Sequence, residues 1–334
     1  MQYRQLCQSF DVKVSAIALG TMSVAAGSMH AAIDEKRAIE TIRAAIDSGV
    51  NFIDTAPAYG NGESEERLGR ALSDIARDRV ILATKASGTT LSREEILADC
   101  ERSLKRLQTS YIDLYQIHWR RGVVPLEETF DALRHLKRQG KVRAIGVCNF
   151  GPADLADADV AKNEIASDQV ASSLFSRGPE FGLQAACQQH GIGILCYSPL
   201  AQGLLTGAYR SVDDVPADRR RSRHFAGSHT GSRHGEAGCE DELFSAIEAV
   251  RQIADREGHT MADLAIAWLL HQPCVASVLC GASTPEQARA NVNAADIKLS
   301  AEIVAELDVA TAKVKNHLGP NLDLWQGSSN TRIH

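Results

Sequence analysis

Short apolar segments alternate with amphipathic segments along this chain, and the alternation restricts the fold more than any other feature. Most of the apolar segments are continuous, as strands of a parallel sheet buried on both faces are. We predict strands at residues 16–20, 51–54, 80–84, 112–118, 142–147, 167–170, 192–198 and 275–279. Eight strands with helices between them predict an α/β fold, namely a (β/α)8 TIM barrel.

The alternative is a doubly wound open sheet, which carries a G-x-G-x-x-G turn after its first strand. The segment "ALGTMSVAAG" contains no such turn, so the barrel is favoured. A chain of 334 residues suits one barrel domain, spanning 1–334. We expect an N-terminal β-hairpin, a long loop over 211–240 at the C-terminal face and a C-terminal tail over 314–334, because 211–240 lacks hydrophobic periodicity.

Two helices have readable ends. Asp34 is the expected N-cap and Gly49 the expected C-cap of a helix with one apolar face. A second helix opens with Ser92 and Glu95, the spacing of a reciprocal capping box.

Composition excludes several classes of protein. The net charge of −6, with no basic face, argues against nucleic-acid binding. The eight cysteines show no C-x-x-C spacing, and no apolar run approaches a membrane span, so we expect a reduced, cytoplasmic protein with neither a metal site nor a membrane contact. Assembly as a homo-oligomer stays open, because no heptad pattern or apolar patch indicates an interface.

Polar residues end several of the predicted strands. Asp54 ends the second strand and Tyr59 lies in the loop after it, Lys85 ends the third strand, and His118 ends the fourth. Each has a structural alternative: a turn cap for Asp54, ring packing for Tyr59, a rim cation for Lys85 and a satisfied core histidine for His118. Because barrel active sites form at the carboxyl ends of strands, we interpret the four together as a catalytic set.

The four residue types suit proton donation to a carbonyl oxygen. An unperturbed tyrosine has a pKa of about 10, and a nearby ammonium stabilises its phenolate. A buried Lys85 needs a carboxylate to stay charged, and Asp54 can supply it. A neutral His118 can hydrogen-bond the substrate oxygen, which makes Tyr59 a general acid. A cofactor must then supply the hydride.

Six separated segments resemble the aldo-keto reductase superfamily: "NFIDTAPAYGNGESEERLGRAL", "ILATK", "SLKRLQTSYIDLYQIHW", "GKVRAIGVCNF", "CYSPLAQGLLTG" and "GASTPEQARAN". The match covers nearly the whole chain. Within the superfamily, the chain is similar to the bacterial sugar- and inositol-oxidising branch and to potassium-channel β subunits. The resemblance implies a catalytic tetrad of Asp54, Tyr59, Lys85 and His118.

The resemblance also implies NADP(H) as the cofactor, with NAD(H) as the alternative. Asn149 and Gln169 would bind the carboxamide and Tyr197 would stack on the nicotinamide ring, while Thr21, Met22, Asp54 and Arg219 would also lie along the cofactor. The pyrophosphate and adenosine contacts would come from Ser198, Pro199, Leu200, Gln202, Gly203, Leu205, Gly281, Ser283, Gln287 and Asn291. Thr284 and Pro285 independently predict a helix start there, which favours a phosphate.

Three departures from the family pattern bear on the cofactor. Cys148 replaces a usual serine, Ala208 replaces a usual lysine, and Ala290 replaces a frequent acidic residue. The 2′-phosphate would therefore depend on Ser283, Arg289 and the arginines of the 211–240 loop. Those arginines have a plain alternative as a solvated loop.

The expected substrate is a small carbonyl compound, a sugar or another polar aldehyde or ketone. Tyr59 and His118 would contact its oxygen, with Trp119 and Arg120 at the rim. Alternatively, Trp119, Arg120 and Arg121 pack against neighbouring loops. Two other functions compete: a cofactor-binding redox sensor with slow turnover, and a Schiff-base lyase using Lys85, which ranks last because Asp54 should keep Lys85 charged.

Overall fold

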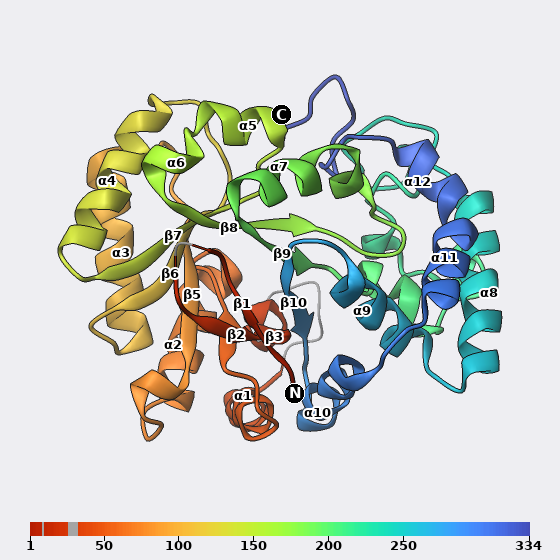
Figure 1. The fold of residues 1–334 in the computed structure, drawn as a ribbon, viewed down its shortest axis with the longest axis horizontal. Helices are drawn as coiled ribbons and strands as arrows, with labels where there is room; N and C mark the ends of the chain where they lie inside the picture. The colour runs from red at the N-terminus through yellow and green to blue at the C-terminus, as the bar shows by residue number, and fades with distance from the viewer. Residues whose placement is uncertain (9, 26–32) are drawn as a thin grey trace.

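The computed structural model describes residues 1–8, 10–25 and 33–334, and eight parallel strands close into a barrel (Figure 1). Around the barrel they are β3 (Ile17–Gly20), β4 (Phe52–Asp54), β5 (Ile81–Ala86), β6 (Ile112–Ile117), β7 (Val142–Cys148), β8 (Ile165–Ala171), β9 (Gly193–Tyr197) and β10 (Val275–Gly281). Each predicted strand is confirmed, with shifts of a few residues at its ends. The TIM barrel prediction is therefore confirmed.

Helices follow each strand and cover the outside of the barrel. They are α1 (Glu35–Asp47), α2 (Glu63–Ala71), α3 (Arg93–Leu107), α4 (Leu126–Arg138), α5 (Pro152–Asp157), α6 (Val160–Asn163), α7 (Leu183–His190), α8 (Glu240–Glu257), α9 (Met261–His271), α10 (Pro285–Asn293), α11 (Ala301–Ala310) and α12 (Ala312–Leu318). Figure 1 shows α8, α11 and α12 stacked together at one side, in agreement with their mutual contacts.

The helix ends agree with the sequence in part. Asp34 caps α1 as predicted, because its side chain accepts a hydrogen bond from the N–H of Arg37. The C-cap is Ser48, however, and Gly49 follows it with φ 92°, the left-handed conformation that ends many helices. Ser92 caps α3, but the Glu95 carboxylate binds the preceding loop instead of completing a capping box.

The predicted N-terminal hairpin is confirmed and closes one end of the barrel. It consists of β1 (Tyr3–Gln5) paired antiparallel with β2 (Lys13–Ser15). Its partners lie where strands begin: Arg4 donates to the carbonyl of Val275, and Ser15 N–H donates to the side chain of Asn51. A Cβ on Gly193 would clash with the carbonyl oxygen of Leu6, so the residue after β1 contacts the first residue of β9 closely.

The register of the parallel strands decides which side chains meet at the open end. Asp54 is level with Gly20 and with Ala83 of β5, and Lys85 is level with Gln116 of β6. Cys148 is level with Gln169 of β8. The polar ends of these strands therefore face one mouth.

Two segments lie outside the barrel pattern. The 211–240 segment contains two short 3-10 helices, Val212–Asp214 and Ala217–Arg219, and runs into α8. Residues 314–318 belong to α12, and the remainder of the tail runs from α12 to a C-terminus beside α5 (Figure 1). The division into a single domain remains a prediction.

Among the residues that the structure describes, no cysteine forms a disulfide. In the described ranges, no helix combines the length and the apolar character needed to cross a membrane.

Leu6 is fully buried where the hairpin seals the barrel. Leu6→Ala should lower the free energy of unfolding by about 2–5 kcal/mol, because it removes apolar contacts and leaves a cavity. Val123→Ala is the matched control, since Val123 is 62% exposed and should change stability by less than about 0.5 kcal/mol. Urea denaturation measures both, and equal stabilities would contradict the sealing role.

Candidate active site

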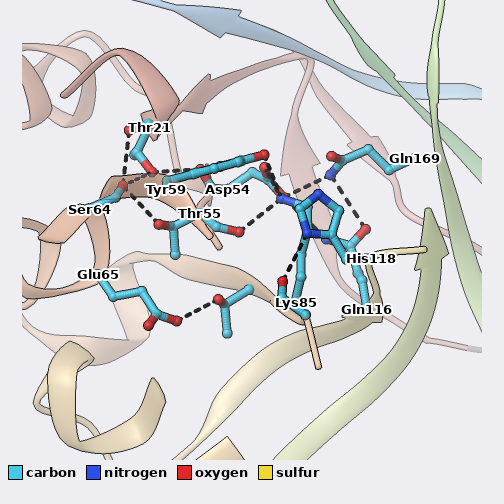
Figure 2. A network of polar contacts seen from close by, with 12 residues as sticks. Thr21, Asp54, Thr55, Tyr59, Ser64, Glu65, Lys85, Gln116, His118 and Gln169 are labelled. Carbon is cyan, nitrogen blue, oxygen red and sulfur yellow. Dashed lines mark hydrogen bonds and ion pairs between the residues drawn. The ribbon is translucent and has the colours of Figure 1, made fainter. Parts of the chain in front are cut away.

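A buried ion pair stands at the mouth of the barrel. The ammonium of Lys85, at the end of β5, donates to Asp54 Oδ2 at 2.6 Å and to the carbonyl oxygen of Thr55 at 2.9 Å (Figure 2). Lys85 is fully buried and Asp54 is 2% exposed. The predicted pairing of these residues is therefore present in the structure.

The second oxygen of Asp54 is held by two amides. Gln116 Nε2 donates to Asp54 Oδ1 at 3.1 Å, and Gln169 Nε2 donates to the same atom at 2.7 Å. A Cβ on Gly146 would lie 3.0 Å from Gln116 Cγ, so the glycine leaves room for this amide inside the barrel. Sequence reasoning missed Gln116, although it lies two residues before His118 and strand periodicity puts both on one face.

The ion pair decides the charge of Lys85. Burial by itself lowers the pKa of a lysine, but the carboxylate of Asp54 raises the pKa of Lys85 above its ordinary value. Lys85 is therefore an ammonium near neutral pH. This charge state disfavours the lyase alternative, which needs a neutral amine as nucleophile.

Tyr59 reaches the ion pair from the loop after β4. Its hydroxyl lies 3.3 Å from Lys85 Nζ. The following residues Gly60, Asn61 and Gly62 have φ values of 59°, 53° and 95°. A glycine-rich sequence tolerates this left-handed turn, which leads the chain directly into α2.

The pKa of Tyr59 moves opposite to the expected direction. Withdrawal of the hydroxyl from water raises the pKa of Tyr59, and the attraction of Lys85 only opposes that rise. Tyr59 therefore remains a phenol near neutral pH. The ammonium still favours the phenolate that forms when Tyr59 gives up its proton, which is what a general acid needs.

His118 follows β6 and faces Tyr59. The two rings are perpendicular, with centroids 6.2 Å apart, and Figure 2 shows the imidazole beside Lys85. Burial, followed by the charges of Lys85 and Arg121, lowers the pKa of His118 to about 3. The imidazole is therefore neutral near pH 7, as expected from the sequence.

The hydroxyl groups of Thr21 and Ser64 form hydrogen bonds with Asp54 and Thr55. Thr21 Oγ1 donates to the carbonyl oxygen of Asp54 at 2.9 Å, and Ser64 Oγ lies 3.0 Å from Thr55 Oγ1. Ser64 and Thr21 also bond each other, at 2.8 Å (Figure 2). Thr21, predicted as a cofactor contact, is thus a buried support of the Asp54 backbone.

The predicted carboxamide residues have partners within the protein. Asn149 Nδ2 donates to the carbonyl oxygen of His118 at 3.2 Å, and its Oδ1 accepts from Tyr197 at 2.8 Å. Gln169 uses its amide N–H groups on Asp54 and, at 3.5 Å, on Gln116. Within the described residues its side-chain oxygen Oε1 accepts no hydrogen bond, so Oε1 is the atom left to accept a bond from a ligand.

Most of the other predicted cofactor residues lie at or after the ends of β9, β10 and β3, which are neighbours in the barrel. Ser283 donates to Gln287 Oε1 at 2.9 Å, and Asn291 donates to the carbonyl oxygen of Gly281. Arg219 lies over the turn after β9 and donates to Gln202 and Tyr209. We call the predicted residues at these neighbouring strand ends the strip.

Leu205 departs from the prediction. Its side chain is fully buried in the core, and its N–H donates to the carbonyl oxygen of Leu200. It therefore presents neither its side chain nor its N–H to a ligand. The turn after β9 directs the Leu205 side chain into the core, and the linear motif does not show which of its residues point inward.

This strip suits a nicotinamide dinucleotide. Ser198, Gln202 and Gly203 have φ values of 54°, 57° and 104°, and such left-handed turns form anion-binding concavities. Helix α10 starts at Pro285 under the cap of Thr284, as predicted, and a helix start favours a phosphate. The ring of Tyr197 lies partly exposed beside these features.

The tail supplies aromatic and charged residues that the sequence did not place at the mouth. The Trp325 ring is parallel to Tyr197, with centroids 6.2 Å apart. The Arg332 guanidinium lies 3.8 Å from the centroid of Trp119 and pairs with the buried Asp323 at 2.7 Å. A residue of the tail thus covers the Trp119 ring.

Arg120, predicted near the substrate, is occupied elsewhere. Its Nη1 lies 2.7 Å from the carboxylate of Asp154 and 2.9 Å from that of Asp157, both in α5. Arg121 donates to the carbonyl oxygen of Gly88. These contacts favour the packing alternative for the two arginines.

Arg223 joins the 211–240 segment to the tail. It is 3% exposed, pairs with Glu236 at 2.7 Å, and donates to the carbonyl oxygens of Asn321 and Leu318. This arginine of the 211–240 loop is therefore not solvated. It is buried, and these oxygens replace water as the partners of its charge.

Arg223→Met should release the tail, since it removes three bonds while keeping an apolar side chain of similar length. We expect backbone hydrogen exchange in residues 319–334 to rise by about tenfold or more. Arg210→Met, an exposed arginine of the same region, is the control. Unchanged exchange in the tail would contradict the tethering role of Arg223.

Comparison with known proteins gives relatives over almost the whole chain. The Aldo/keto reductase family matches residues 16–312. An aldo-keto reductase of Bacillus subtilis (strain 168) is 37% identical over 300 residues, covering 87% of each chain. The NADH-specific methylglyoxal reductase of Escherichia coli (strain K12) is 34% identical over 312 residues, covering 87% of this chain and 92% of its own.

Solved structures agree. An aldo/keto reductase from Klebsiella pneumoniae in complex with NADP and acetate superposes with a TM-score of 0.71 at 32% identity, covering 92% of this chain and 95% of that one. The family match spans the barrel that carries Asp54, Tyr59, Lys85 and His118. This chain therefore belongs to the aldo/keto reductase family and is an oxidoreductase.

Proposed function

We propose that this protein reduces the carbonyl group of a small polar aldehyde or ketone, sugars included, to the alcohol with NADP(H). The observation that carries the proposal is the meeting of the Tyr59 hydroxyl, the Lys85 ammonium and the neutral His118 ring at one mouth. A hydroxyl proton and an uncharged donor directed at one point suit an oxygen that gains electron density.

A bound nicotinamide cofactor would supply the hydride. Its reactive end would be held by Asn149, by the side-chain oxygen of Gln169 and by the ring of Tyr197. The left-handed turn after β9 and the start of α10 would hold its phosphates. The exposed Arg289 and the partly buried Ser283 are the candidates for the 2′-phosphate of NADP(H). NAD(H) is the alternative, since a relative is named as NADH-specific.

Tyr59 gives its proton to the substrate oxygen, and the rest of the tetrad makes that transfer favourable. Lys85 stabilises the phenolate left behind, and it can do so because Asp54 keeps it charged inside the barrel. Gln116 and Gln169 hold Asp54 in place, so the carboxylate does not turn toward Tyr59. His118 hydrogen-bonds the same substrate oxygen and orients it.

The walls of the mouth support a small substrate. Trp119 and Trp325 bring flat aromatic surfaces to it, and the charges of Arg120 and Arg332 are already paired with carboxylates. One relative is named for methylglyoxal, a short dicarbonyl compound. We therefore place short polar carbonyl compounds first and longer sugars second.

Replacing Tyr59 by phenylalanine should remove the proton donor while keeping the ring. We expect kcat/KM for carbonyl reduction to fall by about 100-fold or more, with NADPH affinity unchanged. Absorbance of the nicotinamide band follows turnover, and fluorescence titration follows cofactor binding. Tyr3→Phe is the matched control, because that hydroxyl bonds Gly49 at the far end of the barrel.

Wild-type turnover by Tyr59→Phe would contradict this role. Very slow turnover by the wild-type protein on every aldehyde, ketone and sugar tested would favour the redox-sensing alternative instead.

The pH dependence follows from the charge states of the site. His118 has a pKa of about 3, and Tyr59 has a pKa above its ordinary value of 10.0. Neither group therefore titrates in the pH range between these two pKa values. The kcat/KM for reduction should be flat from about pH 5 to about pH 9 and fall above about pH 10, where Tyr59 loses the proton that it donates. Circular dichroism at each pH controls for unfolding, and an inflection near neutral pH would show that His118 titrates there.

A further inference from the structure

His118 has a hydrogen-bond partner outside the predicted tetrad. The hydroxyl oxygen of Ser87, in the loop that follows β5, lies 2.9 Å from Nδ1 of the imidazole. In the part of the chain that the structure describes, Ser87 is the one hydrogen-bond partner of this ring. Nε2 is therefore the nitrogen left to meet a substrate oxygen.

The neutral state of His118 makes its tautomer important. With a pKa of about 3, the imidazole carries a single N–H near neutral pH, on either Nδ1 or Nε2. The hydrogen bond made by one ring nitrogen selects the state of the other. A serine hydroxyl can donate or accept, so the distance alone is compatible with both tautomers.

The two tautomers present different groups to a carbonyl oxygen. With the proton on Nε2, His118 is a second donor beside Tyr59. With the proton on Nδ1, Nε2 would present a lone pair to an oxygen that is itself an acceptor. That lone pair would also compete with the substrate for the Tyr59 proton, so only the Nε2–H form supports reduction.

Helix α3 holds the loop that carries the Ser87 hydroxyl. Asp99 of α3 lies near the backbone N–H of Ser87, which opposes the rise that burial causes in the pKa of Asp99. The Glu95 carboxylate accepts from the N–H groups of Thr89 at 2.9 Å and Thr90 at 2.8 Å. Glu95 of α3 therefore anchors the loop just after Ser87, and the hydroxyl can act on His118 without moving the backbone.

We infer that Ser87 is a positioning residue: its hydroxyl donates a hydrogen bond to Nδ1 and so holds His118 as the Nε2–H tautomer. This inference rests on the proposed carbonyl reduction, in which His118 donates to the substrate oxygen. Ser87 itself does not touch the substrate. Its side chain lies two residues after Lys85, so the same strand end supplies both the ammonium and the group that orients the imidazole.

The tautomer can be measured without turnover. In protein labelled with 15N-histidine, with His118 assigned through His118→Gln, we expect a protonated Nε2 and an unprotonated Nδ1 in the wild-type chain. Ser87→Ala should shift both resonances toward a mixture of tautomers. Ser87→Thr, which keeps a hydroxyl, should restore the wild-type pattern. A wild-type spectrum with the proton on Nδ1 overturns the inference.

Kinetics provide the second measurement. Because one neutral hydrogen bond is lost, Ser87→Ala should lower kcat for carbonyl reduction by about three- to tenfold. The Kd for NADPH should not change, and Ser87→Thr should recover most of the loss. Ser73→Ala, an exposed serine after α2, is the control for serine removal.

The two proposals fail in different ways. If the wild-type protein reduces no carbonyl compound, the proposed function fails, while the resonances of His118 still report its tautomer. If the protein is active and Ser87→Ala leaves both the tautomer and kcat unchanged, the role of Ser87 is wrong. A loss of kcat in Ser87→Ala with an unchanged tautomer also overturns it.

Discussion

The ion pair between Lys85 and Asp54 is the interaction on which the rest of the mouth depends. An ammonium and a carboxylate 2.6 Å apart are withdrawn almost completely from water. Such a pair is tolerated only when the remaining hydrogen-bonding capacity is also satisfied. Here Gln116 and Gln169 bind the second carboxylate oxygen, and the Thr55 carbonyl binds the ammonium.

The same ammonium acts on both groups that face a substrate. Burial lowers the pKa of His118 and keeps the imidazole neutral, and the charge of Lys85 adds to this effect. The ammonium also opposes the rise that burial causes in the pKa of Tyr59. One fixed cation thus helps to keep one donor uncharged and supports a phenolate. The sequence predicts that Lys85 lowers the pKa of Tyr59. Burial of the hydroxyl outweighs that effect, and the extent of burial follows only from the tertiary structure.

The barrel and the four tetrad positions were predictable because they depend on local patterns. Continuous apolar strands identify a parallel sheet, and Asp54, Lys85 and His118 each end or follow such a strand. Gln116 and Ser87 were missed although each lies two residues from a tetrad member. An amide or a hydroxyl beside a charged group has no signature of its own, so its importance appears only with its partner.

The sequence by itself determined the eight strands, the helices between them and the gathering of polar strand ends at one mouth, since continuous apolar strands indicate a parallel sheet whose carboxyl ends meet at one face of a barrel. Only the tertiary structure decided the contacts that depend on distant segments. It buried Arg223 under the tail, turned Arg120 toward α5 and set Arg332 against Trp119. Long polar side chains reach across loops of irregular conformation, and no periodic pattern in the chain specifies where such loops meet.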